Sequence, residues 1–138
     1  MGGRRLILLD THVLIWLDQD DPVLGPTARE RADRAHRAAD LAVSAISFWE
    51  VAMLAAKGRI VVGLPLPKWR LDLLRSGLVE IALDGRLGIA AAELGGIHSD
   101  PADRMIVASA RANGATLLTA DQRILDWPGK LDRLDARL

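Results

Sequence analysis

The chain has 138 residues, enough for one domain with its own hydrophobic core, and we expect a single domain over residues 1–138. Half of the residues are hydrophobic, which excludes a disordered chain, and the absence of cysteine excludes disulfides and thiolate metal sites. A formal net charge of zero argues against a general polyanion binder and leaves room only for local basic patches. We expect a cytoplasmic protein, because no apolar run is long enough to cross a bilayer and no signal-peptide pattern is present.

The first half of the chain predicts two strands and three helices. Residues 6–9 form an apolar run typical of a central parallel strand, and a short helix is expected over residues 12–17. After a turn-rich connection, a polar helix is predicted over residues 27–40, with Thr27 and Glu30 in the spacing of a capping box. A strand over residues 41–43 and a helix over residues 46–57 follow.

Helices and strands continue to alternate in the second half. Three helices are predicted, over residues 67–77, 87–94 and 101–113. Three strands are predicted, over residues 79–83, 115–119 and 131–134, with a short helical turn from Asp121. Strands that alternate with helices predict an α/β domain with a parallel sheet. Ligands of such domains bind at the carboxyl ends of the strands.

Two aspartates come directly after predicted strands. Asp10 follows the strand over residues 6–9, and Asp121 lies just beyond the strand that ends at Thr119. Both carboxylates are therefore expected at the edge where the sheet presents its site. The alternative for each is that it caps the helix that follows, and the residues alone leave both interpretations open. Two interpretations are also open for Thr11, which could cap the next helix or hold a metal-bound water.

Glu50 lies on the face of its helix that should meet the core. Residues 46, 50, 53, 54 and 57 share this face at a period of 3.6, and Glu50 is the acid among them. An acid on a buried face needs a partner, which favours a functional role. The alternative is a capping box with Ser47, which requires the helix to begin at that serine.

The segment HSDPADRMIVASA supplies a further acid on a buried face. Pro101 belongs at the first helical position, which makes Asp100 the N-cap. Asp103 then heads an i, i+3, i+4, i+7 stripe of apolar residues, which is unusual for an acid. We assign Asp100 mainly to capping. His98 is a possible ligand, but a lone loop histidine is more often a bystander, and we expect it to be one.

These four acids predict a metal site at one edge of the sheet. Clustered carboxylates repel one another and raise their pKa values, and a divalent cation resolves that conflict. Magnesium prefers oxygen ligands, as manganese does, and a bound ion activates water for attack on a phosphodiester. The predicted metal ligands and catalytic residues are Asp10, Glu50, Asp103 and Asp121.

The stretches around the four acids resemble the PIN-domain ribonucleases, and within them the VapC-type toxins of VapBC toxin–antitoxin pairs. The matching stretches are LLDTHVLIW, SAISFWEVAML, HSDPADRMIVASA and TLLTADQRIL, in the family's order over nearly the whole chain. The resemblance implies a Rossmann-like α/β/α sandwich and magnesium-dependent cleavage of RNA that inhibits translation. It also implies a homodimer and a cognate antitoxin whose tail covers the site. By motif, the acidic quartet of the family corresponds to Asp10, Glu50, Asp103 and Asp121, with Asp121 at its most variable position.

Two other functions stay open. One is another metal-dependent phosphoryl-transfer enzyme on a similar sheet, but His12 stands where a haloacid-dehalogenase phosphatase needs its second aspartate. A response-regulator receiver is also disfavoured, because no lysine follows the strand that ends at Thr119. The other is a non-catalytic α/β binding module whose acids are helix caps, and it would bind magnesium no better than any acidic surface.

Basic and aromatic residues are candidates for holding partners. Trp49, beside Glu50, is expected to pack in the core or against a partner rather than to stack on a base. The helices around Trp49 and Trp69 offer apolar surface for a second copy or for an antitoxin. The candidate phosphate contacts are Arg4, Arg5, Lys57, Arg59, Lys68, Arg70, Arg75 and Arg104.

Overall fold

A five-stranded sheet forms the centre of the protein, whose structure is a computed structural model that describes residues 5–138. The strand order is β3-β2-β1-β4-β5, and every neighbouring pair is parallel. The parallel α/β sheet predicted from the sequence is therefore confirmed, including its last strand. The strands are β1 (Ile7–Leu9), β2 (Leu41–Ser44), β3 (Val79–Ile81), β4 (Thr116–Thr119) and β5 (Arg133–Asp135).

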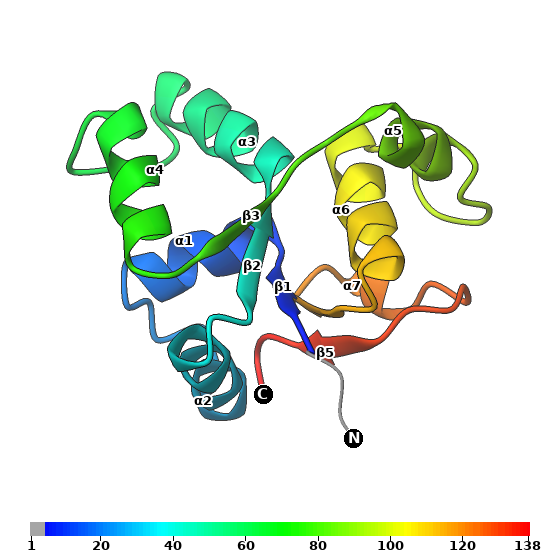
Figure 1. The fold of residues 1–138 in the computed structure, drawn as a ribbon, viewed down its shortest axis with the longest axis horizontal. Coiled ribbons are helices and arrows are strands. Elements are labelled where there is room, and N and C mark those ends of the chain that lie inside the picture. Colours follow the sequence, from blue (N-terminus) through cyan, green and yellow to red (C-terminus); the bar gives the residue numbers. More distant parts are fainter. Residues whose placement is uncertain (1–4) are drawn as a thin grey trace.

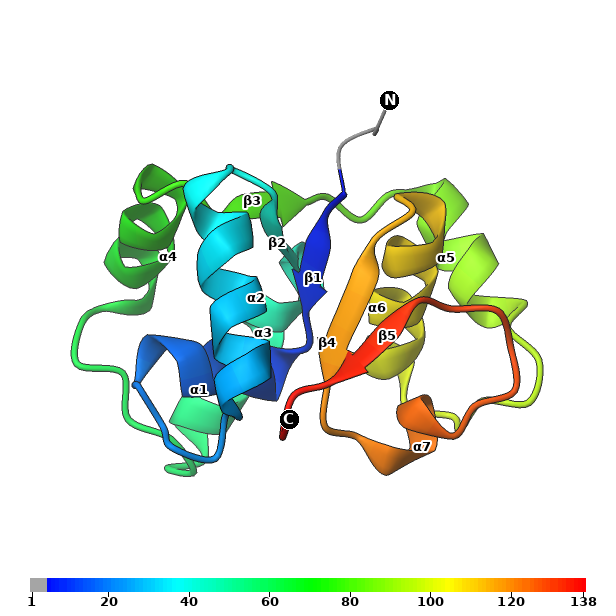
Figure 2. The same cartoon turned by 90° about the horizontal axis from the view of Figure 1, so that it is seen from below.

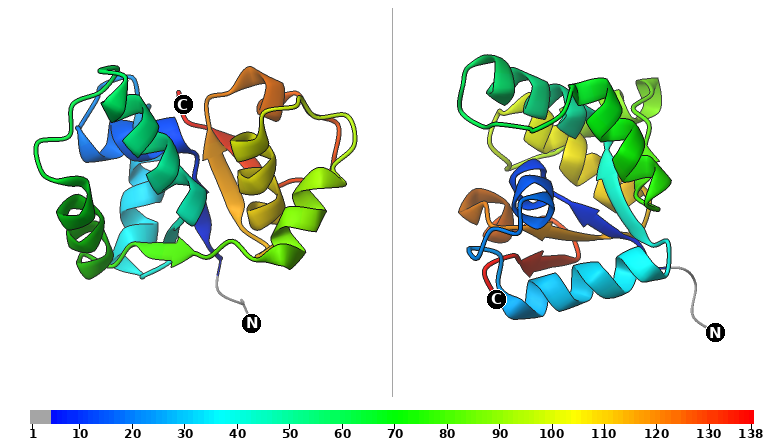
Figure 3. Two further views of the ribbon diagram at one scale, coloured as in Figure 1. Left: turned by 90° about the horizontal axis from the view of Figure 1, so that it is seen from above. Right: turned by 90° about the vertical axis from the view of Figure 1, so that its left-hand side faces the viewer.

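Helices cover both faces of this sheet. One layer contains α1 to α4 and the other contains α5 to α7, with the strands between them (Figure 1), and Figure 3 shows the same layers from above. No helix within residues 5–138 is long and apolar enough to cross a membrane. The helices of the described chain are α1 (Thr11–Asp18), α2 (Pro26–Arg37), α3 (Ala45–Ala56), α4 (Leu66–Arg75), α5 (Gly85–Ala92), α6 (Pro101–Ala112) and α7 (Gln122–Leu125).

The central strand β1 is buried on both faces, as its continuous apolar run predicts. Ile7 and Leu9 pack in the cluster formed with α1 to α4, whereas Leu8 packs in the cluster formed with α5 and α6. This alternation follows from the two-residue period of a strand. β1 is therefore held from both sides, and the residue that follows it has a fixed position.

The helices α1 to α5 each begin one or two residues earlier than predicted, and the caps of α2 and α5 show why. The helix α2 begins at Pro26, after the N-cap Gly25, and no side chain caps it, so the predicted capping box of Thr27 and Glu30 is wrong. Proline at the first helical position moves the start one residue upstream. The helix α5 also begins earlier than predicted, because the side chain of Asp84 caps it.

The carboxyl ends of neighbouring strands meet at one edge of the sheet. Leu9 of β1 is in register with Val43 of β2 and Leu118 of β4, and β1, β4 and β5 run in the same direction (Figure 2). Residues directly after β1, β2 and β4 are therefore neighbours in space although they are far apart in the sequence.

Candidate active site

Asp10 is held through both of its carboxylate oxygens. It follows β1, is only 2% exposed and caps α1, since the backbone N–H of Thr11 donates to its Oδ1 at 2.8 Å. The hydroxyl of Thr119, at the end of β4, donates to Oδ2 at 2.6 Å. Both interpretations of the sequence therefore hold at once, because Asp10 is a helix cap and also lies at the sheet edge.

Glu50 projects from α3 toward the start of α1. The hydroxyl of Thr11 donates to its Oε1 at 2.5 Å and lies 2.8 Å from the hydroxyl of Ser47. The N-cap of α3 is Ser44, whose side chain accepts from the N–H of Ile46. The capping box between Ser47 and Glu50 is therefore wrong, because the helix starts upstream of Ser47.

Asp103 lies in the first turn of α6 and is 9% exposed. As predicted, Asp100 is the N-cap, and its Oδ1 accepts the backbone N–H of Asp103 at 3.1 Å. The Nε2 atom of His98 lies 2.6 Å from Oδ2 of Asp103, so His98 is not the bystander that we expected. Its Nδ1 is buried without a partner among the described residues. An orphaned donor is rarer than an orphaned acceptor, so we place the proton on Nε2, from which it is donated to Asp103.

Asp121 follows β4 and caps the short helix α7. Its backbone N–H donates to the hydroxyl oxygen of Thr119 at 3.0 Å, so one threonine contacts the acids that follow two different strands. The guanidinium of Arg123 pairs with both carboxylate oxygens of Asp121, at 3.2 and 3.1 Å. Nη2 of the same arginine lies 3.7 Å from Oδ2 of Asp103.

The structure brings all four predicted acids together. One potential ligand atom each of His98, Asp103 and Asp121 lies within 4.8 Å of the others. Asp10 and Asp103 are both close enough to Glu50 for their charges to raise its pKa. We call Asp10, Glu50, Asp103 and Asp121 the acid cluster.

Burial, neighbouring charges and hydrogen bonds shift the pKa values of three acids of the cluster. Burial raises the pKa of Glu50 above its ordinary value of 4.5 and the pKa of Asp103 above 3.8, and neighbouring carboxylates add to both increases. A side-chain hydrogen bond partly opposes each increase. Burial acts in the same direction on Asp121, but the hydrogen bonds and charge of Arg123 outweigh it and hold that pKa below 3.8.

The donor atoms of the acid cluster fit a hard divalent cation. Within residues 5–138, Glu50 Oε2 and Asp103 Oδ1 accept no hydrogen bond, so each has its lone pairs available. Carboxylate oxygens are the ligands that magnesium and manganese prefer, and a cation among them removes the repulsion that raises their pKa values. Glu50 and Asp103 would supply these oxygens, and the firmly held carboxylate of Asp10 lies beside them.

Comparison with known proteins identifies the family. The model of the PIN-domain family matches residues 7–130. The chain belongs to the PIN-domain family. The PIN domain is 34% identical to Ribonuclease VapC22 of Mycobacterium tuberculosis (strain ATCC 25618 / H37Rv) over 119 residues, which are 86% of this chain and 88% of that protein. The family resemblance predicted from the four motifs is therefore confirmed.

Solved structures share the fold of this PIN domain. A chain of DNA-bound VapBC from Salmonella typhimurium matches with a TM-score of 0.65 and 23% identity, over 95% of this chain and 98% of that one. A chain of VapBC2 from Rickettsia felis, bound to a DNA fragment from its promoter, matches with a TM-score of 0.64 and 20% identity, over 94% and 99% of the two chains. At this identity the likeness shows the fold, which is the predicted α/β/α sandwich.

Arg104 of the PIN domain has a different role from the predicted one. Its guanidinium donates to five backbone carbonyls that precede α6, at distances from 2.9 to 3.5 Å, which are those of Ala91, Ala92, Leu94, Ile97 and His98. These bonds occupy the donors that an RNA phosphate would need, so the predicted phosphate contact is wrong. Arg104 instead holds the segment that carries His98, the partner of Asp103.

Two other residues predicted to contact phosphate form ion pairs within the PIN domain. Arg70 forms a two-pronged ion pair with Glu80, at 2.9 and 2.6 Å, and Lys68 pairs with Asp72 one turn along α4. Arg4 lies outside the described residues. Sequence reasoning missed Arg123, an arginine that contacts two acids of the cluster.

The two tryptophans expected on an apolar surface lie in different environments. Trp49 on α3 is 56% exposed and Met53, one turn later, is 38% exposed, so Trp49 is not a core residue. Trp69 on α4 is 6% exposed, and its indole N–H donates to Asp18 at 3.0 Å, so it adds little to the exposed surface. The apolar surface predicted for partners therefore consists of α3 residues more than of Trp69.

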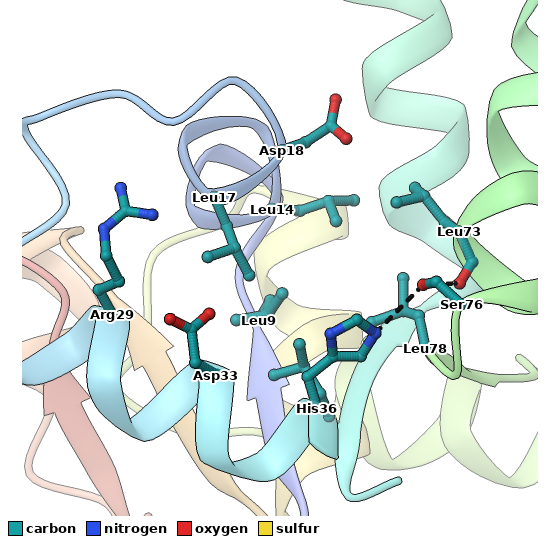
Figure 4. A pocket seen from close by; sticks show the side chains of 11 residues that line it. Leu9, Leu14, Leu17, Asp18, Arg29, Asp33, His36, Leu73, Ser76 and Leu78 are labelled. Atoms are coloured by element: carbon teal, nitrogen blue, oxygen red, sulfur yellow. Dashed lines mark hydrogen bonds between the residues drawn. The ribbon is translucent and has the colours of Figure 1, made fainter.

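A pocket of about 300 Å³ lies away from the acid cluster, between α1, α2 and α4 (Figure 4). Leucines such as Leu14 and Leu73 line its interior, and His36, bonded to Ser76 at 3.1 Å, lies at its side. None of the four acids lines it. The acid cluster, and not this pocket, is therefore the candidate active site.

Replacing Glu50 with glutamine should stabilise the PIN domain at neutral pH when a chelator is present. A raised pKa means that the fold favours the protonated acid. The stability that the fold has with protonated Glu50 is complete below pH 4.5 and is lost as the pH rises through the raised pKa. Partial exposure screens the repulsion, so we expect the melting temperature to rise by no more than about 2–4 °C at pH 7 and not to change at pH 4.

Thermal unfolding with EDTA at both pH values measures this effect. Glu30→Gln, at an exposed position on α2, is the control and should change little at either pH. A lower melting temperature for Glu50→Gln at pH 7 would show that the charged form of Glu50 stabilises the fold.

Proposed function

We propose that this PIN domain is a magnesium-dependent endoribonuclease and the toxin of a type II toxin–antitoxin pair, acting in the cytoplasm to inhibit translation. The observation that carries the proposal is the meeting of four acids, from residues 10 to 121, at one edge of the sheet. The 34% identity with a protein named Ribonuclease VapC22 supports RNA as the substrate. Manganese is the expected alternative to magnesium, because it accepts the same oxygen ligands.

The acids of the cluster have different roles in the proposed hydrolysis of a phosphodiester. Hydrogen bonds from Thr11 and Thr119 hold both carboxylate oxygens of Asp10, so its negative charge has a defined position beside the cation site. Glu50 and Asp103 provide the oxygens that accept no hydrogen bond within residues 5–138. A bound magnesium ion supplies Lewis-acid polarisation of the phosphodiester and of the attacking water.

The pKa shifts of the acids agree with these proposed roles. Glu50 and Asp103 both have a raised pKa, which suits either of them to take up a proton from the attacking water. Asp121, with a lowered pKa, stays ionised and completes the negative charge around the cation. The proposal therefore gives each acid of the cluster a role in holding the ion, with Glu50 and Asp103 also able to accept a proton.

Partners are part of the same proposal. The similar folds solved as VapBC complexes support a cognate antitoxin as the inhibitor. Trp49 and Met53 expose apolar surface on α3, one turn apart, and such surface is unusual unless a partner covers it. We therefore propose α3 as part of the surface used for an antitoxin or for a second copy in a homodimer.

Metal-dependent cleavage of RNA tests the proposal. Purified protein is incubated with total cellular RNA, and new 5′ and 3′ ends are mapped by sequencing. We expect cuts with magnesium or manganese, none with EDTA, and none with calcium, whose larger and looser coordination suits this site poorly. Cleavage that persists in EDTA, or that is absent with both magnesium and manganese, would contradict the proposal.

A further inference from the structure

Arg123 is placed between two acids of the cluster and solvent. Its side chain is 62% exposed, yet Nη2 lies 3.1 Å from Oδ2 of Asp121 and 3.7 Å from Oδ2 of Asp103. Among the lysines and arginines of residues 5–138, it is the one that pairs with acids of the cluster. A single guanidinium therefore neutralises two carboxylates that come from different elements.

The backbone of Arg123 is fixed, whereas most of its side chain is exposed to solvent. The carboxylate of Asp121 accepts the backbone N–H of Arg123 at 2.9 Å, and the next residue, Ile124, is fully buried. Within residues 5–138 the guanidinium contacts Asp103 and Asp121 only, and most of its surface is in water. Exposed ion pairs are weak, so the guanidinium can exchange these carboxylates for another anion at little cost.

The carboxylate oxygens that Arg123 contacts belong to the residues that we propose as cation ligands. A divalent cation bound to Asp103 and Asp121 would neutralise the carboxylates that attract the guanidinium of Arg123. The cation and the guanidinium, both positive, would also repel each other at this distance. Arginine presents a planar fork of donors that matches the oxygens of a phosphate group. An RNA phosphate held at the acid cluster would lie within reach of this fork.

We propose that Arg123 binds the RNA phosphate at the acid cluster, and that it competes with the divalent cation for Asp103 and Asp121 until RNA is bound. This inference rests on the proposed function and adds to it a substrate-binding residue. The inference predicts that loss of the guanidinium raises the affinity for the cation, because a competitor is removed. The same loss lowers the affinity for RNA, because a phosphate ligand is removed. A purely structural role would weaken both kinds of binding together.

Arg123→Gln is the test, and Arg34→Gln is its control. Arg34 is 67% exposed and pairs with Glu30 on α2, so the control removes a similarly exposed, paired arginine outside the cluster. Calorimetry with manganese alone measures cation affinity. Stopped-flow fluorescence anisotropy measures the binding of a labelled single-stranded RNA at saturating magnesium, before the RNA is cut.

We expect Arg123→Gln to bind manganese more tightly, by about fivefold or less because the pair is exposed, and to bind RNA about tenfold more weakly. Arg34→Gln should match the parent protein in both assays. Unchanged or weaker manganese binding by Arg123→Gln would overturn the competition, and unchanged RNA binding would overturn the phosphate contact. Both assays measure binding, so they decide the role of Arg123 separately from whether the wild-type protein cuts RNA.

Discussion

Replacing Asp10 with asparagine should lower RNA cleavage by about a thousandfold. The substitution removes a negative charge from the centre of the acid cluster while leaving the shape of the side chain unchanged. Cation binding and stabilisation of the negative charge that develops on the phosphate both depend on that charge. Calorimetric titration with manganese should show a parallel loss of affinity, which separates this effect from a loss of RNA binding.

The fold should survive this substitution. Asparagine is as good an N-cap as aspartate, so the backbone N–H of Thr11 keeps its acceptor. The new amide nitrogen would face the hydroxyl of Thr119, which is able to rotate and accept a hydrogen bond. Circular dichroism and thermal unfolding verify the fold. If folded Asp10→Asn cuts at the same sites and rate as the wild type, the assignment of nuclease activity to the acid cluster fails.

Replacing Arg104 with glutamine should have the second largest effect. Five carbonyls lose a charged donor, and we expect a loss of about 2–3 kcal/mol in the free energy of unfolding. Cleavage should fall as well, because the segment from Ala91 to His98 would no longer hold His98 against Asp103. Urea unfolding measures the loss of stability, and limited proteolysis should show faster cutting within residues 93–100.

Two further variants make the test of Arg104 specific. Arg86→Gln removes an exposed arginine from α5, beside the same segment, and should change neither stability nor cleavage. Arg104→Lys keeps the charge but should rescue little, because an ammonium group lacks the fork that reaches several carbonyls at once. Full stability and cleavage in Arg104→Gln would show that these hydrogen bonds are dispensable.

The acids of the site could be predicted because local patterns determine where they lie. Asp10 and Asp121 each follow an apolar run, and strand ends of a parallel sheet share an edge. Asp103 interrupts an apolar stripe of period 3.6 that is buried, as predicted. The predicted core face around Glu50 is wrong, because α3 buries Ser47 and Val51 and exposes Met53. The positions of Asp10, Asp103 and Asp121 follow from strand and helix periodicity, together with the rule that parallel strands end on the same side, whereas Glu50 joins the cluster from a half-buried face of α3.

The partners of the acids could not be predicted in the same way. His98 lies in an irregular segment, where no periodicity indicates the direction of its ring. Arg104 is next to Asp103 in sequence, but its carbonyl partners come from the chain that precedes α6, and only the fold brings them together. Trp49 and Trp69 are both tryptophans on apolar helices, and their different exposure depends on how α3 and α4 pack.

Thr119 also determines when the site can exist during synthesis of the chain. Its bond to Asp10 spans 109 positions of the sequence, and its hydroxyl also accepts the N–H of Asp121. A growing chain that has not yet reached β4 contains Asp10, Glu50 and Asp103, but it has neither the hydroxyl that holds Asp10 nor the fourth acid. If the protein cuts RNA as proposed, a ribosome can therefore translate most of its message before the nascent product is able to damage RNA.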